Sequence, residues 1–84
     1  MSNPSDLKEL IDKEDADLTA AVHEEIRKER MSAYWRGPIE PHIASEEDYD
    51  QRKMIADYAK RFPHLHADAI ASTVWFAIYR DHLR

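Results

Sequence analysis

Apolar residues recur at helical spacing through the first third of the chain. They fall mainly three, four or seven positions apart, which places them on one face of an α-helix: Leu7, Leu10, Ile11, Leu18, Ala21, Val22, Ile26 and Ala33. Asn3 and Pro4 precede this stripe as an N-cap and first-turn pair, because proline lacks an amide hydrogen that the first turn leaves unbonded. The pattern predicts a long helix over about residues 5–35, with fraying of residues 1–6. A break in the charged stretch 12–17 is the alternative.

Gly37, the only glycine of the chain, marks the expected end of this first helix. Arg36 precedes it at the negative end of the helix dipole, and Pro38 follows it and forbids continuation. Gly37 is therefore predicted to adopt the left-handed conformation that closes many helices, and residues 37–44 are predicted to form a connector.

The second predicted helix covers residues 46–61. Ser45 and the acidic residues after it resemble a capping box, in which a hydroxyl caps the helix and a carboxylate reaches back. Pro63 ends the helix. The buried side is expected to carry Tyr49, Ile55, Tyr58, Ala59 and Phe62.

The third predicted helix, over residues 67–83, is apolar on more than one side. Ten of the thirteen residues from 67 to 79 are apolar, whereas a helix at the surface of a small bundle buries a stripe of roughly 100°. Such a helix either lies centrally under the other two or supplies a contact between two copies of the chain. We expect self-association through Ile70, Val74, Trp75, Phe76, Ile78 and Tyr79.

Composition agrees with an all-α fold. The chain has 84 residues, with one glycine and four prolines, too few turn residues for a β-sandwich or barrel. A chain of this length holds one hydrophobic core. The sequence therefore predicts a single domain, 1–84, built as a small three-helix bundle with a long first helix.

Charge and cysteine content narrow the function. The net charge is −5, and residues 1–30 carry nine acidic and five basic side chains, so most of the negative charge lies in the first third. This distribution argues against direct nucleic-acid binding, which needs clustered lysine and arginine, and suits a basic protein partner. The chain has no cysteine, no apolar run of the roughly 20 residues that span a bilayer, and no secretion signal in its first residues, so we expect no membrane association and a cytoplasmic location.

Neither a metal site nor a catalytic set is expected. His64, His66 and Asp68 form a His-x-His-x-Asp run, but a turn before a helix uses such residues as caps, and a zinc site needs three or four converging ligands. No serine lies in a nucleophile elbow. A helix-turn-helix over 52–79 lacks polar side chains on its second helix for reading bases. We therefore expect no metal and no cofactor, and lean against an enzyme.

Two segments are candidate partner-binding sites. Tyr34, Trp35 and Arg36 are residue types that dominate binding energy at protein interfaces. The alternative is that one aromatic ring packs inward and the other lies over the connector. Glu46, Glu47 and Asp48 are a candidate acidic rim that steers encounter, or else ordinary first-turn acids that favour the helix dipole.

Residues 7–18 resemble the first helix of the all-helical chorismate mutases, whose pattern is Leu-Arg-x-x-Ile-Asp-x-x-Asp-x-x-Leu. Residues 50–53, Asp-Gln-Arg-Lys, loosely resemble the Asp-x-x-Arg-Glu segment of that family. The resemblance implies an intertwined helical dimer, which would suit the apolar third helix.

The site that this resemblance implies is a cage of cations around a dianion. Lys8 stands where the family has its first arginine, Glu25 where it has its second, and Arg36 where it has its catalytic lysine. Lys53 replaces the acidic residue after Arg52, and the late glutamine of the family would fall beyond Arg84. The alternative function is thus a chorismate-mutase-like enzyme with a degenerate active site.

The leading hypothesis is a small helical protein-interaction module, regulator-like or inhibitor-like, of the kind found in phages and mobile elements. It would act as a homodimer and bind an unidentified protein. A second alternative is an acidic mimic of nucleic acid.

Overall fold

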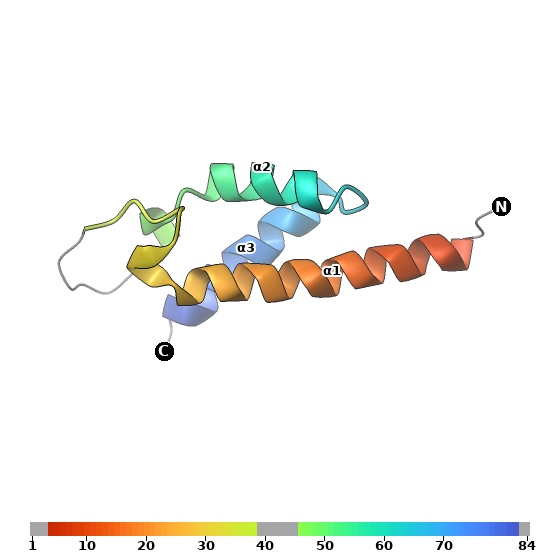
Figure 1. Ribbon diagram of the computed structural model, residues 1–84, viewed down its shortest axis with the longest axis horizontal. Coiled ribbons are helices and arrows are strands. Elements are labelled where there is room, and N and C mark those ends of the chain that lie inside the picture. The colour runs from red at the N-terminus through yellow and green to blue at the C-terminus, as the bar shows by residue number, and fades with distance from the viewer. Residues whose placement is uncertain (1–3, 39–45, 83–84) are drawn as a thin grey trace.

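The computed structural model describes residues 4–38 and 46–82, which form three α-helices and two short 3-10 helices (Figure 1). In chain order the elements are α1 (Pro4–Arg27), η1 (Glu29–Met31), η2 (Glu46–Asp48), α2 (Gln51–Arg61) and α3 (Ala67–His82). The described residues contain no strand, only one isolated antiparallel bridge between Trp35 and Tyr49. The predicted all-α three-helix fold is confirmed.

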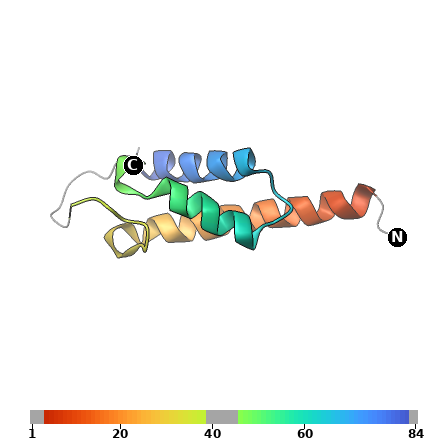
Figure 2. The same cartoon turned by 90° about the horizontal axis from the view of Figure 1, so that it is seen from above.

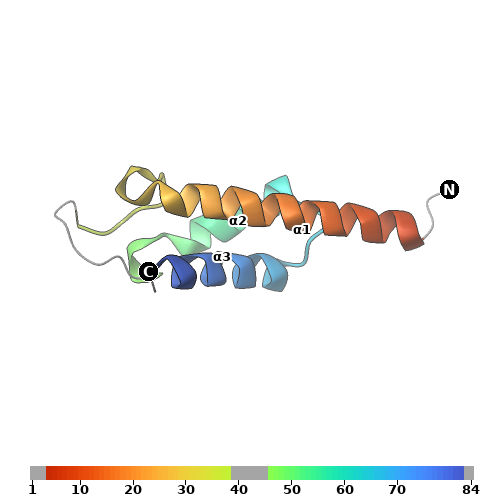
Figure 3. The same ribbon diagram turned by 90° about the horizontal axis from the view of Figure 1, so that it is seen from below.

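The helices run up, down and up, so α2 is antiparallel to both α1 and α3 (Figures 1 and 2). α1 is much the longest, with 24 residues against 11 in α2 and 16 in α3. Its N-terminal end continues past the other two helices, which Figure 3 shows from below.

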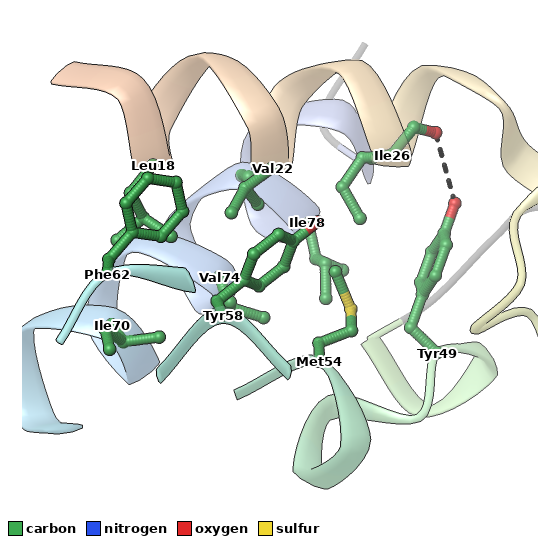
Figure 4. Close-up of a cluster of buried hydrophobic side chains, with 11 residues drawn as sticks. Leu18, Val22, Ile26, Tyr49, Met54, Tyr58, Phe62, Ile70, Val74 and Ile78 are labelled. Carbon is green, nitrogen blue, oxygen red and sulfur yellow. Dashed lines mark hydrogen bonds between the residues drawn. The ribbon is translucent and has the colours of Figure 1, made fainter. Parts of the chain in front are cut away.

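One hydrophobic core fills the space between the three helices (Figure 4). α1 contributes Leu18, Val22 and Ile26, which lie four residues apart and are at most 2% exposed. Of the residues predicted for the second helix, Tyr49, Tyr58 and Phe62 are buried, and Ile55 and Ala59 are partly buried. The other buried hydrophobic residues are Met54, Ile70, Val74, Ala77 and Ile78.

The first helix is shorter than predicted, ending at Arg27 rather than near residue 35, and it has no break at 12–17. Beyond it, Glu29 has a φ of 48°, a left-handed conformation that costs a non-glycine residue about 1–3 kcal/mol. The Glu25 carboxylate offsets this cost by accepting hydrogen bonds from Ser32 Oγ and Ala33 N, which hold the chain in a reversed turn. Side-chain hydrogen bonds within this turn therefore help to end the helix, since none of residues 28–35 is a strong helix breaker.

Gly37 does not close α1, and it does not adopt a positive φ, so the predicted left-handed cap is wrong. Its role is spatial. A Cβ atom at this position would lie 2.5 Å from Asp48 Oδ1 and 2.8 Å from Trp35 Cζ2. Glycine is needed here because the two ends of the connector approach each other closely.

The second helix begins at Gln51 rather than at residue 46, where the chain forms η2 instead. Its N-cap is Asp50, whose side chain accepts a hydrogen bond from the backbone of Lys53 at 3.2 Å. The predicted cap, Ser45, and most of the predicted connector, 39–44, lie outside the described residues, as do residues 1–3 and 83–84.

Candidate functional site

α3 is apolar on two opposite sides. Ile70, Val74 and Ile78, three of the six residues predicted to mediate self-association, are at most 2% exposed and pack into the core of their own chain. That part of the prediction is corrected, because the other helices of the same chain already cover these side chains. The remaining three, Trp75, Phe76 and Tyr79, point away from the core.

These three side chains form what we call the aromatic face. Trp75 is 39% exposed, Phe76 57% and Tyr79 44%. The rings of Trp75 and Tyr79 stack with centroids 5.0 Å apart and planes 10° apart, while Phe76 meets Trp75 edge-on at 5.1 Å. Stacking fixes the rings in one arrangement, so less side-chain entropy would be lost on binding.

Tyr34 lies against the core rather than on an open surface. Its hydroxyl donates a hydrogen bond of 2.7 Å to the Asp57 carboxylate on α2, and its ring lies 6.4 Å from that of Tyr58. Partial burial, together with the bond to Asp57, raises the pKa of Tyr34 to about 12. Hydrogen bonds from Tyr34 and Lys53 lower the pKa of Asp57. Tyr34 therefore fastens the segment that follows η1 to α2.

Trp35 and Arg36 join the two ends of the connector. The Trp35 ring packs edge-on against Tyr49 at 5.3 Å, and Arg36 N donates to the backbone oxygen of Asp48 at 2.6 Å. The Arg36 guanidinium donates to two nearby backbone oxygens and lies 3.7 Å from the Asp50 carboxylate. This arrangement matches the predicted alternative, in which one ring packs inward and the other lies over the connector: Tyr34 packs against the core, and Trp35 Nε1 donates to Pro38 O at 3.3 Å. Partner binding by this segment stays a prediction.

The three acidic residues 46–48 do not share one orientation. Glu47 is exposed, whereas Asp48 is 9% exposed and turned toward the connector beside Gly37. The side chain of Glu46 lies outside the described part of the chain. Asp48 therefore contributes to the fold of this region rather than to an outward acidic rim.

Glu25 is a structural residue that the chorismate-mutase resemblance placed in a substrate site. Its side chain is 15% exposed and accepts hydrogen bonds from Ser32 Oγ, Lys28 Nζ and Ala33 N. Burial alone would raise the pKa of Glu25, but the bonds from Ser32 and Lys28 outweigh it and lower the pKa. The carboxylate is thus ionised and already bonded within its own chain.

The other positions of that resemblance are spread along the molecule. Lys8 lies near the N-terminal end of α1, paired with Asp12 at 3.1 Å, and roughly 28 Å of helix separates it from Arg27. Arg36 lies beyond that far end, between η1 and η2. A single chain therefore does not bring Lys8 and Arg36 into one site.

The histidines after α2 contact acidic groups of the protein. Glu14 accepts a hydrogen bond from the backbone of His64 at 3.1 Å and also contacts the His64 ring. His66 Nδ1 accepts from the backbone of Asp68 at 3.1 Å, as expected of a turn before a helix. Among residues 4–38 and 46–82, no three histidine or acidic side chains gather closely enough to hold a metal ion.

Glu14 and Glu25 were missed from the sequence as anchoring residues, although a signal was present. Both positions fall on the apolar face of the first helix, in register with Leu18 and Val22. A charged residue within an apolar stripe needs a partner when the stripe is buried. Glu14 accepts a hydrogen bond from His64 in the turn between α2 and α3, and Glu25 accepts one from Ser32.

Comparisons with known proteins found no matching family model, no matching curated protein and no matching solved structure. Within the described residues, no helix combines the length and the apolar character needed to cross a membrane.

Proposed function

We propose that this chain is a cytoplasmic protein-interaction module that works as a homodimer, and that the aromatic face of α3 is its contact surface. The observation that carries the proposal is the exposure of three large aromatic side chains on the side of α3 away from the core, with Trp75 stacked on Tyr79 and edge-on to Phe76. Aromatic residues are enriched at protein interfaces, and exposed groups of them on small proteins mark interaction sites.

The other large hydrophobic side chains that are exposed among the described residues, Leu7, Leu10 and Met31, include no aromatic ring. Met31 is 85% exposed but stands in η1, beyond the C-terminal end of α1. The candidates predicted near the connector, Tyr34 and Trp35, are only partly exposed and are packed against the core. A role as a regulator or inhibitor of a further protein stays a prediction.

The proposal is tested by measuring molar mass with light scattering after gel filtration. The double variant F76Q/Y79Q replaces two exposed rings with polar side chains of good helix propensity, so it should keep the fold and shift the protein toward monomer. M31Q is the matched control, because it removes the large hydrophobic side chain that is most exposed among the described residues. If the wild type and both variants have the same mass, the aromatic face is not the contact surface.

A further inference from the structure

The N-terminal end of α1 carries a second apolar surface that its own chain leaves open. The turn between α2 and α3 meets α1 at Glu14, through the bond from the His64 backbone. Residues 4–13, roughly 15 Å of helix, lie beyond that point, and we call them the projecting segment (Figure 1). Leu7 and Leu10 within it are 49% and 47% exposed.

The projecting segment continues the core-facing side of α1. Leu7, Leu10 and Ile11 share a helix face with Leu18 and Val22, which are fully buried in the core. Their stripe therefore faces the side of α1 on which the core and α3 lie. Charged residues such as Lys8 and Asp12 pair with each other elsewhere on the segment and leave this stripe apolar.

The aromatic face points to the same side of the molecule as this stripe. It lies on the side of α3 away from the core, and so away from α1. Figure 3 shows α1 above α3 and running on past the start of α3, and we call this offset of the two helices the step. A chain cannot close this step by itself, because its aromatic face is turned away from its own α1.

A two-fold rotation makes such a step self-complementary. The rotated copy places its α3 beneath the projecting segment of the first, with its aromatic face turned toward Leu7 and Leu10. The same rotation repeats the contact in the other direction, as an interface with two-fold symmetry requires.

The exposed area also fits a second copy. The three aromatic residues expose roughly 280 Å² together, taking about 200 Å² for each fully exposed side chain. An interface of ordinary size buries about 800 Å² per partner, of which about 450 Å² is apolar. Leu7 and Leu10 add roughly 150 Å². The apolar area that one copy can bury therefore comes close to the usual value only when these leucines are covered together with the aromatic face.

Charge favours the same occupant. Residues 4–17 carry six acidic and two basic side chains, whereas α2 carries four basic and one acidic. A second copy therefore brings a basic helix into the same dimer, packed on the core side of its α3. An acidic partner would be repelled by the segment.

On the basis of the homodimer proposed above, we infer that the stripe formed by Leu7, Leu10 and Ile11 of each copy packs on the aromatic face of the other. The dimer is then held by two equivalent contacts between α1 of one chain and α3 of its partner. The aromatic faces do not pack on each other, and neither do the two α1 helices in this region.

Cysteine cross-linking tests this arrangement directly, because the chain has no cysteine of its own. An L10C chain carrying a size tag is mixed with an F76C chain, allowed to exchange subunits and oxidised mildly. Both positions are about half exposed, so neither substitution opens the core. A disulfide needs Cα atoms within about 7 Å, so a small shift of α1 along the partner's α3 would prevent the bond from L10C. L7C, one helical turn away, is therefore tested in the same way. E9C, on the opposite face of α1, is the matched control.

The expected result is a tagged–untagged disulfide dimer from L10C or L7C with F76C, and none from E9C. If wild-type protein is dimeric but disulfides join only L10C to L10C, or only F76C to F76C, this arrangement is wrong while the homodimer stands. The same holds if no disulfide forms with either leucine variant. If wild-type protein is a monomer in the parallel mass measurement, the homodimer and this inference both fail.

Discussion

Replacing Glu25 with glutamine tests whether the hydrogen bonds of its carboxylate stabilise the turn that follows α1. Glutamine keeps the size and helix propensity of glutamate but removes its negative charge. The Glu25 carboxylate accepts from Ser32 Oγ at 2.5 Å, Lys28 Nζ at 3.2 Å and Ala33 N at 3.3 Å. A glutamine side chain has one acceptor oxygen, so it cannot satisfy all three donors.

The expected loss is about 2 kcal/mol of unfolding free energy. Hydrogen bonds to a charged group contribute about 1.5–3 kcal/mol, and Glu25 is well enough buried for most of that value to apply. The bond from Lys28 adds little, because that side chain is half exposed. For a domain of this size the midpoint of thermal unfolding should fall by roughly 8–16 °C.

Thermal unfolding followed by circular dichroism, at one fixed protein concentration, measures the effect. E24Q is the matched control, because Glu24 neighbours Glu25 but its side chain is 70% exposed. Its ion pair with Arg27 is exposed and long, at 3.8 Å. E24Q should change the unfolding free energy by less than about 0.5 kcal/mol. Equal midpoints for E25Q and E24Q would refute the anchoring role of Glu25.

The pH dependence gives the same prediction an independent check. The pKa of Glu25 is lower in the folded protein than its usual 4.5, so the ionised form stabilises the fold. This stabilisation is present above pH 4.5 and is lost as the pH falls through the lower folded pKa. The difference between wild type and E25Q should therefore be full at pH 7 and shrink toward pH 3. A difference that does not change with pH would contradict the assignment.

Three further variants test the connector and the second helix. Y34F should lower the unfolding free energy by about 1 kcal/mol, because it removes the bond to Asp57. Since folding raises the pKa of Tyr34 to about 12, the difference in unfolding free energy between wild type and Y34F should be constant below pH 9 and shrink above pH 10. Urea titrations measure it, and a difference that stays constant to pH 11.5 would exclude the bond to Asp57. G37A should cost about 1–3 kcal/mol, because its Cβ would collide with the buried Asp48 side chain, and an unchanged thermal midpoint would show that the connector ends separate freely. D50A should cost about 1 kcal/mol and D50N much less, since asparagine also caps helices; equal losses in thermal unfolding would deny the capping role.

The helices could be predicted from the sequence because their signals are local. The four-residue spacing of Leu18, Val22 and Ile26 fixes the buried side of α1, and Pro63 ends α2 close to where it was expected. The third helix was predicted almost to its observed bounds, since an apolar run between a proline turn and the C-terminal arginines has few other interpretations.

The region between α1 and α2 could not be predicted in this way. Residues 28–35 are acceptable in a helix, and the chain turns back through side-chain and backbone bonds such as those of Glu25, Tyr34 and Trp35. Gly37 and Pro38 look like a helix end, but the glycine is needed for space between elements distant in sequence. Contacts of this kind depend on how the elements pack, and the spacing of residues along the sequence does not predict them.

The candidate site was predicted in part for the same reason. The excess of apolar residues on the third helix pointed to a contact surface, but helical spacing alone did not separate Ile70, Val74 and Ile78, which face the core, from Trp75, Phe76 and Tyr79, which face outward. That separation needs the positions of α1 and α2 around α3. The stripe of Leu7 and Leu10 was visible in the sequence, but its lack of cover depends on how far α1 extends past the bundle.

Sedimentation equilibrium of the wild-type chain across a concentration series tests the central proposal most directly. If the aromatic face and the projecting segment are covered by a second copy, the fitted mass should approach twice 9.9 kDa as the concentration rises. A single mass of 9.9 kDa at every concentration would show that these apolar surfaces stay open in solution, and would contradict the homodimer.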